Sequence, residues 1–276
     1  MIFDTVIVNG DLLSADQAHI SIFNSAYFSS FGVYETVKVD QGRPFYLQEH
    51  FQRLFKSAAM IDLLLAVDSQ TLTNWFNRLR AVDPQATWSL KMIALGALDS
   101  AEAPVVAMQA LPLPSYPDSF YEQGASAVLF EGERLLPTCK SLNTLVNFMA
   151  RRAAIQADVL EGLLHHNGYL TEGSRSNLFA VADGQLLTSP TSAVLSGITR
   201  DVILQAMQTT GSPVIEKPLA ADPSLYEEFF VSSTSMHVMP ITTIDGHPVG
   251  NGAVGPITKV AMAHFNDHYN TFMSQA

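Results

Sequence analysis

The spacing of hydrophobic positions predicts both strands and a helix in the first part of the chain. Residues 6–13 and 34–47 have strand patterns, and the turn Gln41-Gly42 splits the second segment into a hairpin. A helix over 47–61 is predicted next, because apolar residues recur there at helical spacing. They are Leu47, Phe51, Leu54, Phe55, Ala58 and Ile61. His50 and Arg53 then share a neighbouring flank, so both could reach one ligand.

The hydrophobic pattern of the residues that follow completes an N-terminal part of α+β type and indicates where a second part begins. Residues 70–81 predict a helix, and 89–95 and 104–111 predict buried strands joined by an acidic, alanine-rich turn. Three prolines between 111 and 118 indicate a linker. We therefore expect an N-terminal part over 1–112, a linker over 113–118 and a C-terminal part over 119–276.

The C-terminal part predicts a mixed sheet or barrel with flanking helices. Its predicted strands are 126–132 and 227–233, its hairpins turn at 182–184 and 244–246, and its helices span 143–157, 199–210 and the residues from about 256. One face of the first of these helices is predicted to be core. That face comprises Leu142, Leu145, Val146, Met149 and Ala153.

Composition narrows the class of protein. With 47% hydrophobic and 15% charged residues, a chain of 276 residues can build one large or two modest cores. A net charge of −11, from 26 acidic and 15 basic residues, disfavours nucleic acid and anionic membranes as partners. Neither a leader pattern nor an apolar run of membrane-spanning length is visible.

Cysteine and histidine usage narrows the class further. Cys139 is the only cysteine, so no intrachain disulfide can form, and we expect a cytoplasmic protein with small-molecule partners. His165 and His166 alternate sides of a predicted strand without an acid or cysteine at metal spacing. We therefore expect no metal site.

Four segments carry candidate chemistry. Lys140 opens KSLNTLVNFMARRAA, where a polar stretch gives way to a helix, and a lysine amine can hold an aldehyde cofactor reversibly. Glu172 ends an apolar strand in GYLTEGSRSNLF. In LSGITRDVILQAM, Gly197 precedes a helix start, which suits a phosphate, with Thr199 suited to capping. EEFFVSSTSMHVMP contains three consecutive small hydroxyl residues.

In order and spacing, these segments and GVYE resemble the class IV aminotransferases, the fold-type IV enzymes that use pyridoxal 5′-phosphate (PLP). The resemblance covers nearly the whole chain and is closest to the D-amino-acid transaminases. It implies a small N-terminal α/β domain, a larger C-terminal mixed-sheet or barrel domain, and an active site in the cleft between them. It also implies a homodimer that transfers an amino group between an amino acid and a 2-keto acid.

The resemblance also implies roles for single residues. Lys140 matches the Schiff-base lysine, Glu172 matches the carboxylate beside the pyridine nitrogen, and Tyr34 matches a tyrosine near the substrate. Ser235 and its neighbours are candidates to present amides to phosphate or to the substrate carboxylate. The residues assigned to the cofactor are Arg53 and Thr234 for the phosphate, Glu172, Leu195 on the ring face, Gly197, Ile198, Thr199 and Ser233.

The chain departs from the family where the substrate carboxylate is expected to bind. The family's arginine before a glycine is replaced by Leu95 in LKMIALGALDS, and no histidine follows. Lys91, Arg43 and the hydroxyls or amides near Thr234 are alternative carboxylate sites, unless the donor is a primary amine. Substrate and chirality stay open. The alternatives are a branched-chain L-amino-acid or primary-amine transaminase, a 4-amino-4-deoxychorismate lyase and a PLP-binding protein without turnover.

Overall fold

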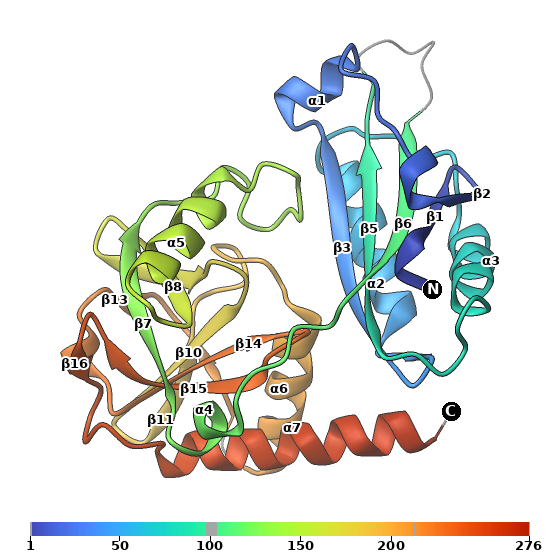
Figure 1. The fold of residues 1–276 in the computed structure, drawn as a ribbon. Helices are drawn as coiled ribbons and strands as arrows, with labels where there is room; N and C mark the ends of the chain where they lie inside the picture. Colours follow the sequence, from blue (N-terminus) through green and yellow to red (C-terminus); the bar gives the residue numbers. More distant parts are fainter. Residues whose placement is uncertain (1, 98–103, 212, 276) are drawn as a thin grey trace. The chain divides into compact units, whose positions relative to one another are not determined.

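The structure is a computed structural model that describes residues 2–97, 104–211 and 213–275 (Figure 1). The predicted helices and strands occur along it in the predicted order, together with short helices over Ser25–Ser29 and Asp118–Glu122 that the hydrophobic pattern does not predict. The acidic, alanine-rich turn expected after residue 95 falls largely on residues 98–103, which lie outside the described residues.

The chain divides into two compact units. Unit 1 comprises Met1–Pro114 and Cys139–Asn143, and unit 2 comprises Ser115–Thr138 and Thr144–Ala276. The division by sequence had placed Lys140 in the C-terminal part, whereas its segment belongs to unit 1. The reason is a non-local pairing of that segment with unit 1, described with the site below.

Unit 1 is built on an antiparallel sheet of six strands, counted over the described residues, in the order β2-β1-β6-β5-β3-β4. Its strands are β1 (Thr5–Val8), β2 (Asp11–Ser14), β3 (Gly32–Asp40), β4 (Arg43–Pro44), β5 (Trp88–Leu95) and β6 (Val105–Leu111). Its helices are α1 (Ser25–Ser29), α2 (Leu47–Ala59) and α3 (Ser69–Arg80), with short 3-10 helices η1 (Ile2–Asp4) and η2 (Ala15–Gln17).

The two faces of this sheet carry different side chains, because successive residues of a strand point to opposite faces. One face packs against α2 and α3, and we call it the helix face. Its core includes Val33, Val37, Leu90 and Met92 of the sheet and Phe51, Leu54 and Phe76 of the helices. The other, which we call the tyrosine face, carries residues that the register places side by side. These are Tyr34, Thr36, Lys38, Lys91, Ile93 and Gln109.

Turn chemistry explains the hairpins of unit 1. The Gln41-Gly42 turn joins β3 and β4 as predicted, with φ of 49° and 77°. The segment predicted as a strand over 6–13 is itself a hairpin of β1 and β2. It turns at Asn9-Gly10, whose φ values of 47° and 95° suit the left-handed turn that Asn-Gly favours. The prediction missed this turn signal.

Unit 2 is built on a mixed sheet of ten strands, counted over the described residues, with parallel pairs β15–β7, β7–β8 and β11–β12. Its strands are β7 (Ala125–Glu131), β8 (Glu161–His166), β9 (Tyr169–Gly173), β10 (Asn177–Ala182), β11 (Gln185–Thr188), β12 (Ile215–Glu216), β13 (Leu219–Ala220), β14 (Glu228–Ser233), β15 (His237–Ile244) and β16 (His247–Pro248). Its helices are α4 (Asp118–Glu122), α5 (Leu145–Gln156), α6 (Ile198–Thr209) and α7 (Pro256–Ser274), with the 3-10 helix η3 (Pro223–Leu225).

The sheet of unit 2 closes on itself. Neighbouring strands run β10-β14-β15-β7-β8-β9, and the pairing of Glu172 with Asn177 joins β9 back to β10. The barrel alternative of the sequence-based prediction is therefore the right one. The hairpins predicted at 182–184 and 244–246 are present, as β10–β11 and β15–β16, and the closing helix begins at Pro256.

The prediction of which face of α5 is buried is wrong. Leu145 is 69% exposed and Met149 41% exposed within this chain, whereas the buried residues of α5 are Ala150 and Ala154. The helix lies against β8, where a Cβ on Gly162 would collide with the backbone of Ala150. Close approach through small residues leaves the larger apolar side chains outside.

Candidate active site

Lys140 lies on a short extended segment that pairs with the start of β3. The amide of Tyr34 donates to the carbonyl of Lys140 at 3.0 Å, and the amide of Leu142 donates to the carbonyl of Gly32 at 2.8 Å. The amide of Lys140 itself donates to Ser57 Oγ of α2 at 3.1 Å. These bonds fix the backbone of Lys140 within unit 1 and explain why the segment does not belong with the helix that follows it.

Two lysine side chains meet the ring of Tyr34. Lys140 Nζ lies 4.5 Å from the ring centroid, and Lys91 Nζ lies 3.9 Å from it. Burial lowers the pKa of Lys91, and Lys140 lowers it further, while Tyr34 and Glu35 act in the opposite direction. The structure thus brings Tyr34, Lys91 and Lys140 together, three of the residues singled out from the sequence.

His50 and Arg53 share a partner, and it is a carboxylate of the protein. On the helix face, Arg53 donates to Glu35 through Nε at 2.6 Å and through Nη2 at 2.9 Å. His50 Nδ1 lies 2.7 Å from Glu35 Oε2 and donates to it, since an ionised carboxylate only accepts. Glu35 is fully buried. Sequence reasoning found the two basic residues but not Glu35, which lies on another element.

Glu172 sits at the closing point of the barrel in unit 2 and is 5% exposed. Arg134 Nη1, itself buried, donates to Glu172 Oε1 at 3.2 Å, and the amide of Leu195 lies 3.4 Å from Oε2. Just after β9, the amide of Ser174 donates to the buried carboxylate of Glu161 at 3.1 Å. Arg134 and Glu161 were not found from the sequence, because both act across strands.

Asn177 connects several of the predicted cofactor residues. It pairs with Glu172 on one side and with Ser232 of β14 on the other. Its side chain donates through Nδ2 to the carbonyl of Leu195 at 2.7 Å, and a Cβ added to Gly197 would collide with its Oδ1. A buried asparagine at the start of the apolar strand NLFAVA was the signal that sequence reasoning passed over.

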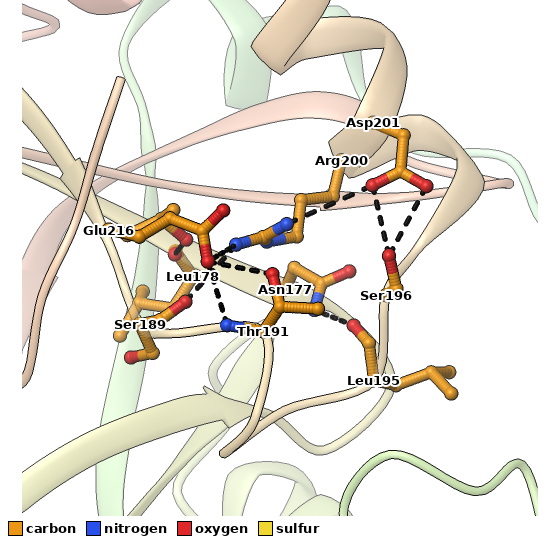
Figure 2. A network of polar contacts seen from close by, with 10 residues as sticks. Asn177, Leu178, Ser189, Thr191, Leu195, Ser196, Arg200, Asp201 and Glu216 are labelled. Atoms are coloured by element: carbon orange, nitrogen blue, oxygen red, sulfur yellow. Dashed lines mark hydrogen bonds and ion pairs between the residues drawn. The ribbon is translucent and has the colours of Figure 1, made fainter.

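The start of α6 is braced by a polar network (Figure 2). Arg200, which is 1% exposed, forms an ion pair with Glu216 at 3.1 Å, and Glu216 also accepts the amide of Thr191 at 2.7 Å. Ser196 Oγ donates to Asp201 at 3.1 Å. These contacts hold the loop that carries Leu195 onto the helix.

The first turn of α6 has the features of an anion-binding helix start. Gly197, not Thr199, is the N-cap residue, and no side chain of the described residues caps this end. Thr199 is buried in the first turn instead. The first backbone N–H groups of α6 have no acceptor within the helix, and the oxygens of a phosphate can accept hydrogen bonds from them.

The hydroxyl residues of 232–235 lie where β14 turns into β15. Ser232 Oγ is buried without a hydrogen-bond partner among the described residues. Ser233 Oγ accepts the amide of Met236 at 3.2 Å, and Ser235 Oγ lies 3.3 Å from the hydroxyl of Tyr116. Thr234 is half-buried in the turn between them.

The residues of each unit fit PLP. Unit 2 joins a buried carboxylate, suited to a ring nitrogen, to a helix start suited to a phosphate. Within the part of the chain that the structure describes, no side chain caps that helix start, and a buried hydroxyl has no hydrogen-bond partner. Unit 1 holds an amine over an aromatic ring. In the described parts of the chain, no cluster of three or more His, Cys, Asp or Glu side chains could hold a metal ion. None of the helices described combines the length and apolar character needed to cross a membrane.

Comparison with known proteins gives the family context. The family model for class IV amino-transferases matches residues 32–244. A D-alanine aminotransferase of Listeria innocua serovar 6a is 34% identical over 273 residues, which cover 94% of each chain. A D-alanine aminotransferase of Bacillus licheniformis is 32% identical over 264 residues, covering 92% of this chain and 93% of the relative.

Solved structures agree on the fold. The branched-chain amino acid aminotransferase of Escherichia coli is 27% identical, with a TM-score of 0.87 over 95% of this chain and 94% of that chain. A T.th. branched-chain amino acid aminotransferase, solved with pyridoxamine 5′-phosphate, is 23% identical, with a TM-score of 0.86 over 95% and 93% of the two chains. The α+β architecture with a barrel-like part is thus the fold-type IV architecture.

Proposed function

Because the chain belongs to the class IV aminotransferase family and is a PLP-dependent enzyme, we propose that it transfers the amino group of a D-amino acid to a 2-keto acid. The preference for the D-series follows the names of the curated relatives. The observation that carries the reaction is the position of Lys140, whose backbone is fixed to β3 and α2 and whose amine lies over Tyr34.

Lys140 is the catalytic residue of this proposal. When bound, PLP supplies an aldehyde that takes up an amine and a ring that draws electrons from the substrate carbon. The amine of Lys140 would hold that aldehyde in the resting enzyme. With PLP bound, the neutral amine of Lys140 would take the proton from the α-carbon of the substrate and would deliver it to the cofactor carbon that carries the amino group.

Glu172 keeps a positive charge on the ring nitrogen in this proposal. A carboxylate beside the nitrogen favours its protonated form, which makes the ring a better acceptor of electrons. Arg134 and the amide of Leu195 hold the orientation of the carboxylate through contacts at 3.2 and 3.4 Å. The side chain of Leu195 is assigned to one face of the ring.

The phosphate is assigned to the start of α6. The amides of Ile198 and Thr199, which follow the Gly197 cap, would donate to it, and Ser233 and Thr234 would add polar groups from the end of β14 and the turn after it. Arg53 is assigned to the same phosphate, with Nε and Nη2 already held by Glu35. Tyr34, Lys91 and Ser235 are assigned to the substrate.

A homodimer and a cytoplasmic location complete the proposal. Large apolar side chains of α5 are exposed within one chain, among them Leu145 at 69% and Phe148 at 62%, and α1 adds Phe28 at 78%. Such side chains favour burial against a second copy. The single, buried Cys139 supports the cytoplasmic location.

A donor panel tests this proposal. Purified protein is loaded with PLP, and the visible absorption band of the bound cofactor is followed after separate additions of D-alanine, D-glutamate, L-leucine, L-glutamate and a chiral primary amine. We expect the band to give way to that of the aminated cofactor with the D-amino acids. Conversion with L-leucine and L-glutamate alone indicates a branched-chain enzyme, and conversion with the amine alone indicates an amine transaminase. A band that no donor converts indicates a 4-amino-4-deoxychorismate lyase or a PLP-binding protein without turnover.

A further inference from the structure

The tyrosine face of unit 1 gathers positive charge in an acidic protein. Lys38 and Lys91 lie on it, Lys140 reaches the ring of Tyr34 beside them, and the whole chain contains only six lysines against 26 acidic residues. Cations on a surface of a protein with net charge −11 are ordinarily matched by nearby acids. Their concentration on one side of one sheet therefore calls for a specific explanation.

Within the described residues, the amine of Lys91 lies beside an aromatic ring and has no carboxylate at ion-pair distance. Its side chain is half-buried and its Nζ lies 3.9 Å from the centroid of the Tyr34 ring. Among the described residues, no carboxylate lies within ion-pair distance of it. Glu35 is on the same strand as Tyr34 but points to the helix face, where Arg53 and His50 hold it. The carboxylate that acts electrostatically on Lys91 is this Glu35, already held by two basic side chains, whereas the one that acts on Lys38 is Asp40.

A half-buried ammonium without an acid is costly unless an anion reaches it. Burial lowers the pKa of Lys91, and the opposing effects of Tyr34 and Glu35 do not cancel it, as expected for an amine that has lost water without gaining a carboxylate at ion-pair distance among the described residues. A bound carboxylate would restore the balance. Because Lys91 and Lys140 both lie at the ring of Tyr34, a carboxylate bound to Lys91 would lie near the amine that carries the proposed reaction.

We infer that Lys91 binds the carboxylate of the amino acid substrate, with the ring of Tyr34 orienting its ammonium. The inference rests on the proposed function for the identity of the anion as a substrate. Lys91 supplies a positive charge on β5, which the apolar Leu95, four positions further along the strand, cannot supply. It also sets the substrate class, because a donor without a carboxylate gains nothing from Lys91.

The test is a binding experiment on the PLP-loaded protein that needs no turnover. Propionate, a carboxylate without an amino group, is titrated into wild type, Lys91→Met, Lys91→Arg and the control Lys259→Met, an exposed lysine of α7. We expect Lys91→Met to weaken binding by about tenfold to a hundredfold, as for the loss of a charged hydrogen bond. Lys91→Arg keeps most of the affinity, and Lys259→Met equals wild type.

Two results overturn the inference: wild type that does not bind propionate, or Lys91→Met that binds it as wild type does. The near-UV circular dichroism of each variant confirms that the fold is kept. Turnover separates this inference from the proposed function. If propionate binding depends on Lys91 but the protein converts no donor, the anion site at Lys91 is supported and the proposed transaminase activity is refuted. With turnover, Lys91→Met raises KM for D-alanine more than it lowers kcat and leaves a primary amine unaffected.

Discussion

The two faces of the unit 1 sheet treat charge in opposite ways, although they share the same strands. On the helix face, Glu35 is fully buried and is matched by Arg53 at 2.6 Å and His50 at 2.7 Å. On the tyrosine face, one residue away, Lys91 and Lys140 lie over the same ring, and Lys91 has no acidic partner among the described residues. Neighbouring residues Tyr34 and Glu35 therefore belong to different environments.

The difference separates charges that are paired within the protein from an amine that is available to a ligand. A buried charge that is fully paired contributes to the fold and is costly to break, because its partners are left uncompensated. An amine that is not neutralised by an acid keeps the ability to bind an anion or to give up its proton. The alternation of a strand keeps the two kinds of charge apart within one sheet. Four experiments test this separation, from the largest effect to the smallest.

Replacing Lys140 should affect the reaction and leave the fold unchanged. We expect Lys140→Ala to lower kcat by at least about 10³-fold, because it removes both the amine that holds the cofactor and the base that moves the proton. The free energy of unfolding should stay within about 1 kcal/mol of wild type. Transamination rates and urea denaturation measure the two effects. Activity close to wild type would remove Lys140 from the mechanism.

Replacing Glu35 should have its main effect on the fold. Glu35→Gln leaves the guanidinium of Arg53 without its buried counter-charge and weakens the hydrogen bond of His50, so we expect a loss of about 3–5 kcal/mol in the free energy of unfolding. Urea denaturation of the protein without PLP measures this loss, and Asp83→Asn, at an exposed position, serves as the control. A loss below about 1 kcal/mol would mean that the cluster does not stabilise the unit.

Acid should weaken the same cluster. Burial alone would raise the pKa of Glu35, but Arg53 and His50 outweigh it and hold that pKa well below its usual range. Burial lowers the pKa of His50 against the opposing effect of Glu35. Both groups thus take up protons more readily when unfolded, and the stability they contribute falls as the pH falls.

The pH window follows from the ordinary values of the two groups. The contribution of His50 to the free energy of unfolding begins to fall as the pH drops through about 6.5. The contribution of Glu35 begins to fall as the pH drops through about 4.3. The difference in unfolding free energy between wild type and Glu35→Gln should therefore narrow below about pH 4.3. Urea midpoints at a series of pH values measure it, and a constant difference would contradict the pairing.

Replacing Lys91 should have the smallest effect on stability. Lys91→Met removes a half-buried ammonium that has no acid at ion-pair distance among the residues that the structure describes, and it roughly keeps the length of the side chain. We expect the free energy of unfolding to change by less than about 0.5 kcal/mol or to rise. Thermal or urea denaturation compares it with Glu35→Gln. A loss as large as that of Glu35→Gln would erase the distinction between the two faces.

Local signals in the sequence predicted much of the fold. The hairpin at Gln41-Gly42 and the apolar face of α2 follow from turn chemistry and helical spacing, which involve only nearby residues. The apolar face of α5 was predicted wrongly, because what the helix buries depends on its contact with Gly162 and not on its own pattern. The hairpin at Asn9-Gly10 could have been predicted from the dipeptide itself.

The candidate site was predictable by residue type and not by partner. The family pattern pointed to Lys140 and Glu172, but it could not show that Lys140 pairs with β3 or that Arg134 meets Glu172. Those contacts join residues far apart in the chain, which a local pattern does not encode. Glu35 escaped notice for the same reason, although both of its basic partners had been identified.

The central claim is that Lys140 carries the chemistry and Lys91 only binds the anion, and reductive trapping tests it most directly. The PLP-loaded protein is treated with sodium borohydride, which fixes the cofactor to the lysine that holds it, and the digested protein is mapped by mass spectrometry. The account predicts a single modified peptide containing Lys140, unchanged in Lys91→Met and absent from Lys140→Ala. Cofactor fixed to Lys91 or Lys38, or a Lys140→Ala variant labelled as fully as wild type, would contradict it.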